Sequence, residues 1–433
     1  MRKILVSILL PVMLLLASCS GSEQSWNEGD WERCARILST VPSDALTVRY
    51  AVDCRKSSFA VDSNSAFAGL GLKSLRGTGF ALAECYNGSV VQVLSLAPVP
   101  DSFRSDSTSA FSTLLARAAA SGMKTSFIPN APTMPQGQGV LLVSRSEVQL
   151  RASERHIREA RSILDLESFP KAIKDAGAPE ELLVLRNSGA KRFIGKDFLG
   201  GIFTPSGISR FLDRLCEWTA FVPEPDGSTS VVLSRNEART HYANLLSSLN
   251  FSDSRIGKVL PYGTSFVMDL PIDGENFRKA YESYQDASVN LVQYRRQLSE
   301  LKSSCGKDPL KWEKELDIKE IAFVERAGCK IIMLRPGKAV ADRETEAFAY
   351  PGFCAALYGS AFQLRDESVC ATRDGWIMIG SEKDLASFTT TEDELDNYTA
   401  KRWPANGCRI IIYDRGEFLA WTKKGIRIWN SNL

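Results

Sequence analysis

The chain has 433 residues, of which 53 are basic and 51 acidic, so its formal net charge at pH 7 is +2. A nearly neutral chain without a block of like charge has no electrostatic footprint for nucleic acid, and we expect no nucleic-acid partner. The length suffices for two or three domains, each with a core of its own.

The first 18 residues have the pattern of an export signal. Two basic residues precede an almost unbroken apolar run from Ile4 to Leu16, and small residues stand before Cys19. This stretch resembles the lipobox of bacterial lipoproteins. The resemblance implies that residues 1–18 are removed and that Cys19 is acylated, so the membrane is reached through the lipid. The alternative is an ordinary secretory signal, or an uncleaved anchor, with a chance cysteine.

The residues after Cys19 indicate to which membrane the protein is anchored. Ser20 stands where lipoproteins kept at the inner membrane usually carry Asp, and the tether that follows is polar and flexible. It has only Glu23 where surface-exported lipoproteins carry an acidic cluster. We therefore expect the chain in the bacterial cell envelope, anchored to the outer membrane and facing the periplasm.

The rest of the chain shows a recurring pattern. Strand-like segments headed by Pro42, Pro179 and Pro261 are each followed downstream by an apolar strand that ends in serine. The alternation predicts tandem related modules, with chance similarity of strand composition as the alternative. We expect a signal peptide at 1–18, a tether and lead-in helix at 19–38, module 1 at 39–170, module 2 at 171–255 packed with module 1, module 3 at 256–400, and a C-terminal β meander at 401–433.

Turn signals and periodicity predict the elements within the modules. Asn87-Gly88 and Ala327-Gly328 each separate two apolar strands, which predicts hairpins. Apolar steps of three and four residues from Phe277 to Cys305 predict one long amphipathic helix in module 3, packed on a sheet in preference to an intermolecular coiled coil. The fold class is therefore α+β, with mixed or antiparallel sheets and helices packed on one face.

Three strand-to-helix junctions carry a serine followed three residues later by an acid. Some hydrolases place their nucleophile at such a turn, but nothing nearby supplies a general base. The spacing is that of a capping box, so we expect the serines to cap helices. The pairs are Ser144 with Glu147, Ser234 with Glu237, and Ser381 with Asp384.

The residue types that carry most catalysis and metal binding are sparse or scattered. The two histidines, His156 and His241, have no patterned acid or thiol beside them, and the nine cysteines after Cys19 contain no C-x-x-C. We predict no catalytic, cofactor-binding or metal-binding residue and no cofactor. Buried free thiols are the expected state, with one or two disulfides left open.

One short motif indicates a modification. Asp106-Ser107-Thr108 resembles the sequence at which some bacteria O-glycosylate exported proteins. Ser107 is therefore a candidate O-glycosylation site.

The module opening resembles a known group of proteins. Val41-Pro42-Ser43-Asp44-Ala45, with an echo from Leu260 to Thr264, is similar to the first strand of a family of uncharacterised bacterial envelope lipoproteins. The resemblance implies a lipid anchor and brings no catalytic residues.

These observations favour a lipid-anchored envelope protein that binds a protein or glycan partner or has a structural role, rather than an enzyme. The alternative is an envelope hydrolase whose site is assembled from distant residues. A further option is carbohydrate binding through Trp403, Trp421 and Trp429, which are otherwise expected in a core.

Overall fold

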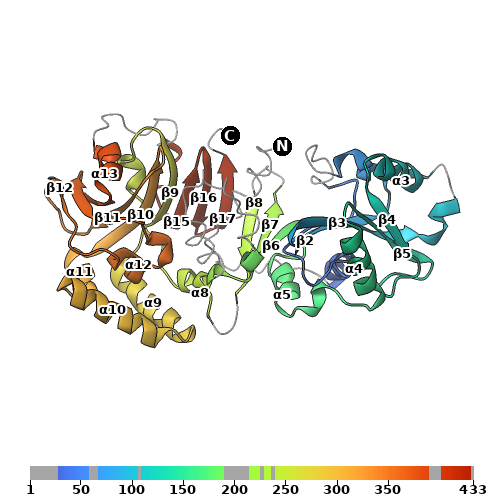
Figure 1. The fold of residues 1–433 in the computed structure, drawn as a ribbon, viewed down its shortest axis with the longest axis horizontal. Helices are drawn as coiled ribbons and strands as arrows, with labels where there is room; N and C mark the ends of the chain where they lie inside the picture. Colours follow the sequence, from blue (N-terminus) through green and yellow to red (C-terminus); the bar gives the residue numbers. More distant parts are fainter. Residues whose placement is uncertain are drawn as a thin grey trace. The chain divides into compact units, whose positions relative to one another are not determined.

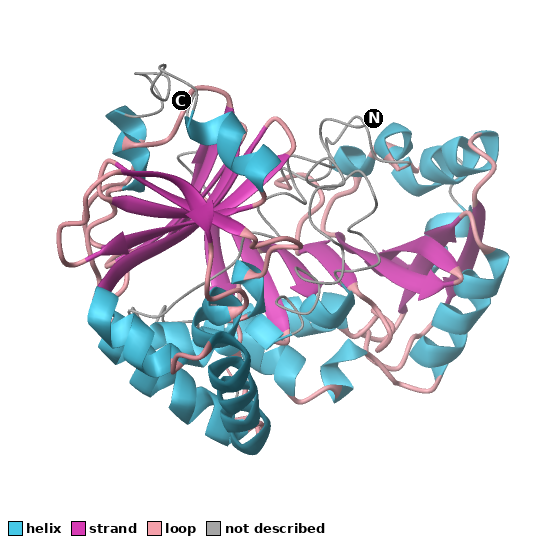
Figure 2. Ribbon diagram, turned by 60° about the vertical axis from the view of Figure 1, so that its left-hand side comes forward, coloured by secondary structure: helices cyan, strands magenta, loops and turns pink. Residues whose placement is uncertain are grey.

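The computed structural model describes residues 28–57, 67–105, 109–189, 214–224, 229–235, 239–389 and 401–430. Within these ranges the chain forms ten α-helices and seventeen strands, which confirms the α+β prediction (Figure 1). The described residues form two compact units, of which the first holds 28–189 and 217–224. In each unit the strands form a layer with helices outside it (Figure 2). None of the described helices is long and apolar enough to cross a membrane.

The first unit is an antiparallel sheet built outward from β1. This strand lies between β2 and β6, and β2 continues through the predicted hairpin at Gly88 into β3. Gly88 has a φ of 73°, a left-handed conformation that glycine adopts without strain. The strand order is β4 (Lys124–Ile128), β5 (Gln138–Ser144), β3 (Ser89–Pro100), β2 (Gly79–Asn87), β1 (Thr47–Ala51), β6 (Glu181–Arg186) and β7 (Trp218–Pro223).

Helices lie on both faces of this sheet. Ala51 of β1 belongs to a core cluster with Leu114 and Ala118 of α3. Its neighbour Tyr50 points to the opposite face, where its hydroxyl reaches Cys34 of α2. Because successive side chains of a strand point to opposite faces of the sheet, these two neighbours contact different helix layers. Helices therefore cover both faces of the sheet, whereas we expected them on one face. The helices are α2 (Glu28–Leu38), α3 (Ala110–Ala120), α4 (Glu147–Arg158) and α5 (Ser168–Asp175).

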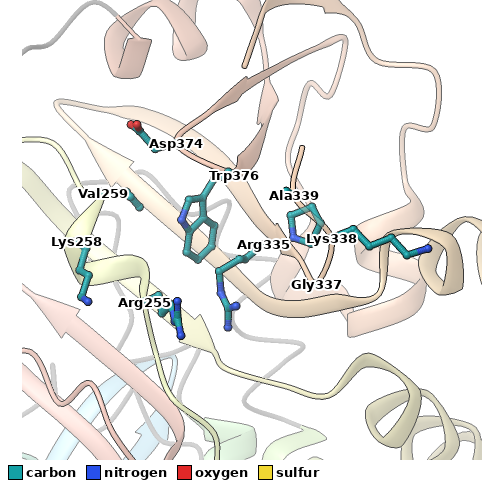
Figure 3. A pocket seen from close by; sticks show the side chains of 11 residues that line it. Arg255, Lys258, Val259, Arg335, Gly337, Lys338, Ala339, Asp374 and Trp376 are labelled. Atoms are coloured by element: carbon teal, nitrogen blue, oxygen red, sulfur yellow. The ribbon is translucent and has the colours of Figure 1, made fainter. Parts of the chain in front are cut away.

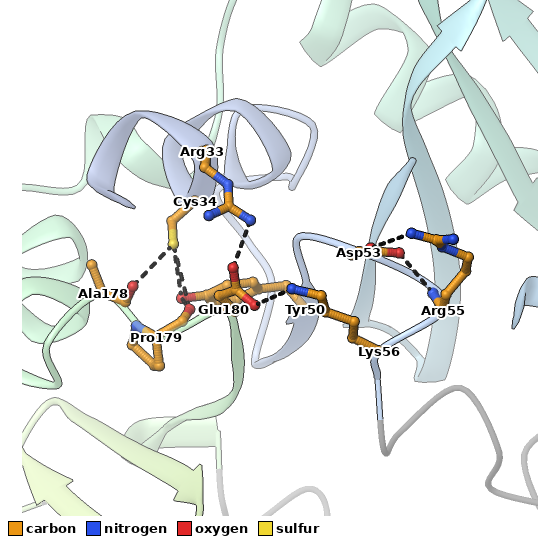
Figure 4. A network of polar contacts seen from close by, with 9 residues as sticks. All are labelled: Arg33, Cys34, Tyr50, Asp53, Arg55, Lys56, Ala178, Pro179 and Glu180. Atoms are coloured by element: carbon orange, nitrogen blue, oxygen red, sulfur yellow. Dashed lines mark hydrogen bonds and ion pairs between the residues drawn. The ribbon is translucent and has the colours of Figure 1, made fainter. Parts of the chain in front are cut away.

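The segment headed by Pro179 belongs to this first sheet. The Tyr50 hydroxyl donates to the Pro179 carbonyl at 2.9 Å, and the Cys34 thiol donates to the same carbonyl at 3.4 Å (Figure 4). Arg33 of α2 pairs with Glu180 at 2.7 Å. Pro179 thus leads into β6 beside β1, and the strands expected in module 2 are divided: β6 and β7 lie in the first unit and β8 in the second.

The second unit is also antiparallel, and its central strand β9 lies between β10 and β15. The predicted hairpin at Ala327-Gly328 joins β10 to β11, and the predicted C-terminal meander forms β15, β16 and β17. The order is β12 (Arg343–Ala347), β13 (Val369–Arg373), β14 (Trp376–Gly380), β11 (Cys329–Pro336), β10 (Ile318–Arg326), β9 (Thr264–Leu270), β15 (Cys408–Asp414), β16 (Glu417–Thr422), β17 (Gly425–Asn430) and β8 (Thr229–Leu233).

The two units share one topology. The order β4-β5-β3-β2-β1-β6-β7 of the first is matched strand for strand by β13-β14-β11-β10-β9-β15-β16 of the second, which adds β12 at one edge and β17 and β8 at the other. Pro42 and Pro261 precede the equivalent central strands β1 and β9. Related tandem modules are therefore present in the topology.

Helices also cover both faces of the second sheet. Leu385 and Phe388 of α13 pack with Val267 and Ala322 of the sheet, while the other helices lie on the opposite side (Figure 1). The helices are α8 (Tyr242–Ser247), α9 (Gly274–Ala287), α10 (Leu291–Cys305), α11 (Pro309–Leu316), α12 (Phe353–Tyr358) and α13 (Glu382–Thr389).

The single long helix expected in module 3 is wrong: the chain breaks between α9 and α10. Val289 adopts a left-handed φ of 57° at the break, and the two helices fold back on each other. Tyr281 of α9 meets Tyr294 of α10 edge-on at 5.5 Å. The apolar steps continue through the break because both helices bury the same stripe, so periodicity alone did not reveal it.

Candidate functional site

A pocket of about 320 Å³ opens in the second unit. Three segments line it: the short 3₁₀ turn Ile256–Lys258 with its flanking residues, the end of β11, and the turn between β13 and β14. Four of the lining side chains are cationic and one is acidic, while the remaining walls are mainly apolar. The cations are Arg255, Lys258, Arg335 and Lys338, the acid is Asp374, and the apolar walls are Val259, Pro336, Ala339 and Trp376.

The cations are not evenly spread around the pocket. Arg255, Lys258 and Arg335 project toward the same side of it (Figure 3). Lys338 points away from them, and its ammonium lies 3.4 Å from the Glu315 carbonyl oxygen. Asp374 lies on the far side of Trp376 from the two guanidinium groups. The positive charge is thus concentrated in three side chains.

One buried carboxylate positions two of these cations. Glu320 of β10 stands opposite Arg335 of β11 in the strand register, and Arg335 Nε donates to Glu320 Oε2 at 2.7 Å. The other carboxylate oxygen accepts the backbone N–H groups of Arg255 and Ile256 at 2.7 and 2.9 Å. Glu320 is fully buried, so these bonds are shielded from water. Its carboxylate therefore ties the 3₁₀ turn and Arg335 to one point of the sheet.

A second carboxyl group lies beside the first. Ser254 Oγ is 2.5 Å from Asp269 Oδ2 and 3.2 Å from Glu320 Oε1, and the Trp403 indole N–H donates to the same hydroxyl. Burial, and then the neighbouring Glu320, hold the pKa of Asp269 well above its usual range. Two carboxyl groups this close do not both ionise in a low dielectric. Glu320, with an arginine and two backbone donors, carries the charge, and Asp269 is neutral.

The side chains that line the pocket are suited to binding an anion. The described part of the lining has donors and positive charge but no serine, cysteine or histidine. The Asp269 and Glu320 side chains lie beneath the pocket lining, with no exposed surface of their own. Among the described residues, no three His, Cys, Asp or Glu side chains are placed to hold a metal ion. Convergent Arg and Lys side chains are the usual means of holding an oxyanion.

The serine junctions are structural, but one differs from the expectation. Ser144 does not cap α4: it is fully buried and its hydroxyl donates to the Gln92 carbonyl at 2.6 Å. The cap is Ser146, whose side chain accepts the N–H of Gln149. The capping box placed at Ser144 was therefore wrong by two residues, because β5 continues as far as Ser144.

The junction at Ser381 is confirmed as a cap. Its hydroxyl accepts the N–H of Asp384 at 3.1 Å and lies 2.7 Å from the Asp384 carboxylate, at the start of α13. Ser234 follows β8, but its partner Glu237 lies outside the described residues. Cys19 and Ser107 also lie outside them, so lipidation and glycosylation stay predictions.

Neither histidine belongs to the pocket. His156 lies within α4 of the first unit, and His241 immediately precedes α8 of the second. No disulfide joins the nine cysteines in the described ranges, and six of them are buried. Burial raises the pKa of the Cys54 thiol to about 12, which makes it a poor nucleophile.

The three C-terminal tryptophans belong to the core. Trp421 is fully buried and Trp403 is 7% exposed. Trp429 stacks on Phe418, with ring centroids 5.5 Å apart. They do not form an exposed row of coplanar rings, and the expectation that they are core residues is confirmed.

Sequence reasoning missed the pocket because its cations lie on segments about eighty residues apart and converge only through strand register. One signal was available: Glu320 directly precedes the apolar run Ile321–Val324 of a predicted strand, and a charge buried there needs a partner. No family model matches the chain, and no curated protein or solved structure matches it.

Proposed function

We propose that this protein is a lipid-anchored envelope protein that binds an anionic group of an envelope protein or glycan through the pocket of the second unit. Acylation at Cys19 would hold it at the outer membrane, facing the periplasm. Binding, and not catalysis, is its role. The observation that carries the proposal is the convergence of Arg255, Lys258 and Arg335 on one side of the pocket.

Physical arguments support this role for the pocket. Its volume is at the lower end of the range of about 300–1,000 Å³ typical of small-molecule sites, which suits one charged group with a small body attached. Glu320 holds the Arg335 guanidinium and the backbone of the 3₁₀ turn in place before a ligand arrives. A preorganised site loses less entropy on binding.

The hydrolase alternative draws no support from this pocket. A hydrolase site needs a nucleophile or a water-activating base within reach of a bound substrate. The nearest buried carboxyl groups, Asp269 and Glu320, are occupied by Ser254, Arg335 and backbone donors. These carboxyl groups hold the residues that line the pocket and are not exposed to a bound ligand.

The test is site-specific photo-crosslinking in the native envelope. A photo-reactive residue at Ala339, on the pocket wall, is compared with the same residue at Val292, which is 84% exposed on α10. We expect a discrete adduct from position 339 alone, lost when Arg255→Glu and Lys258→Glu are added together. An adduct that survives charge reversal, or equal labelling at both positions, would refute the proposal.

A further inference from the structure

We propose that the anionic group held by the pocket is a phosphate ester bound as its dianion. This inference rests on the proposed function and names the class of ligand for the same site. Three features of the pocket carry it: its charge balance, its uncommitted donors and its apolar wall.

The charge balance favours a doubly charged ligand. Three cations point to one side of the pocket, and Glu320 beneath Arg335 offsets one of them. Asp374, beyond Trp376, is paired with Arg373. Asp269 adds no negative charge because burial keeps its carboxyl group protonated. Two positive charges therefore remain uncompensated. A carboxylate neutralises one of them, whereas a phosphate monoester carries about −1.5 to −2 at pH 7.

The donors left free at the pocket suit a group with several oxygens. An arginine has five N–H donors, and Arg335 commits its Nε–H to Glu320. Its terminal nitrogens make no hydrogen bond to another described residue, and neither does the side chain of Arg255. With the Lys258 ammonium, three separate cations approach from one side. A tetrahedral phosphate presents three oxygens to such an arrangement, whereas a planar carboxylate presents two.

The apolar wall favours an ester over the free ion. Val259, Pro336 and Ala339 line the pocket together with the indole of Trp376. The side chains of Val259, Pro336 and Ala339 offer no donors and the indole offers a single N–H, so this wall would leave part of an inorganic ion without partners. They provide contact surface for the carbon body attached to a phosphate.

The experiment is calorimetric titration of the full-length lipoprotein in detergent with glycerol phosphate, sulfate and acetate. We expect glycerol phosphate to bind at least about tenfold more tightly than acetate at pH 7.5. Its affinity should fall severalfold at pH 5.5, because the second phosphate proton binds with a pKa of about 6. Sulfate keeps its charge over this range, so any pH effect on sulfate reports titration of the protein itself.

Variants tie binding to the pocket. Arg255 is exposed, so Arg255→Gln should leave the fold intact and weaken glycerol phosphate binding about tenfold. Arg296→Gln on α10, which removes an exposed arginine of the same unit, should change nothing.

The outcomes separate this inference from the proposed function. Acetate binding as tightly as glycerol phosphate, in an Arg255-dependent way, overturns the phosphate inference and leaves anion binding standing. Failure of every anion to bind, together with crosslinks indifferent to charge reversal, overturns both.

The same chemistry has two sources, a lipid headgroup or a soluble phosphate ester. Vesicles bearing a lipid with a phosphomonoester headgroup are compared with vesicles bearing a phosphodiester lipid of single charge. Arg255-dependent binding to the first alone assigns a lipid source. Binding of soluble glycerol phosphate without either vesicle assigns a soluble ester.

Discussion

Glu320 is the residue on which the candidate site depends most. Its buried carboxylate accepts hydrogen bonds from Arg335 and from the backbone N–H groups of Arg255 and Ile256, and the Ser254 hydroxyl lies within hydrogen-bond distance of it. A glutamine has one acceptor oxygen in place of two and adds an N–H₂ group that faces other donors. The carboxylate is therefore needed both for stability of the second unit and for the shape of the pocket.

We expect Glu320→Gln to lower the free energy of unfolding by about 2–3 kcal/mol, because Arg335 loses its partner and a buried donor is left unpaired. Urea denaturation measures the loss. Glu346→Gln on the exposed edge strand β12 removes a surface ion pair and should cost less than about 0.5 kcal/mol. Equal effects of the two substitutions would contradict the role assigned to Glu320.

Asp414 gives the second unit a pH dependence. Burial raises its pKa to about 7, and neither carboxylate oxygen has a hydrogen-bond partner in the described part of the chain. The folded state therefore binds more protons than the unfolded state between about pH 4 and 7. Stability should fall as pH rises through this window and level off above it. Glu325, whose pKa burial also raises to about 7, acts in the same direction.

Asp414→Asn should remove much of this dependence. The amide cannot ionise, so we expect the variant to gain on the order of 2 kcal/mol over the parent at pH 8 and little at pH 5. Thermal melts at both pH values measure the difference. Glu300→Gln, on the exposed face of α10, serves as the control and should leave the pH profile unchanged. A parent profile that rises from pH 5 to 8 would show the assignment to be wrong.

At the scale of secondary-structure elements, features that depend on adjacent residues were predicted correctly, and features that depend on contacts between distant residues were not. The turns at Gly88 and Gly328 were predictable because a hairpin depends on a few adjacent residues. The cap of α4 was predicted at the wrong serine because the Ser144 hydroxyl donates to the Gln92 carbonyl of a neighbouring strand. The local sequence does not indicate this contact. The pocket was unpredictable for the same reason, since Glu320 and Arg335 meet only through the register of β10 and β11.

Substitutions at and beside the break between α9 and α10 test whether the helix is interrupted at Val289. Val289 is 92% exposed and left-handed, a conformation that costs a β-branched residue about 1–2 kcal/mol. Val289→Gly should therefore stabilise the second unit by about 1 kcal/mol, as measured by thermal unfolding. Val292→Gly is the matched control: this valine is also highly exposed but lies in the first turn of α10, so glycine there should destabilise by about 0.3 kcal/mol. The same sign for both substitutions would contradict the break.

At the scale of the whole chain, the sequence pattern predicted a repeated module, but it did not predict which sheet the strand after Pro179 joins. Pro42 and Pro261 precede equivalent central strands, and the strand orders around β1 and β9 agree. Pro179 precedes β6, which pairs with β1 as β15 pairs with β9. A proline at the head of a strand satisfies a local requirement, since the first residue can do without its N–H. The sheet in which that strand is placed depends on partners more than a hundred residues away.

The placement of the chain in the cell is predicted to depend on one atom, the sulfur of Cys19. Without residues 1–18, whose removal we predict, the chain carries 51 basic and 51 acidic residues. Its net charge therefore provides no electrostatic attraction to an anionic membrane. Two or three acyl chains on one cysteine anchor a protein far more firmly than one. We expect Cys19→Ala to abolish palmitate labelling and to shift the protein from the membrane pellet to the soluble fraction. Cys305→Ala, which removes a free thiol at the end of α10, should leave both unchanged. Retention of the Cys19→Ala variant in carbonate-washed membranes would show that the chain is held by something other than its lipid.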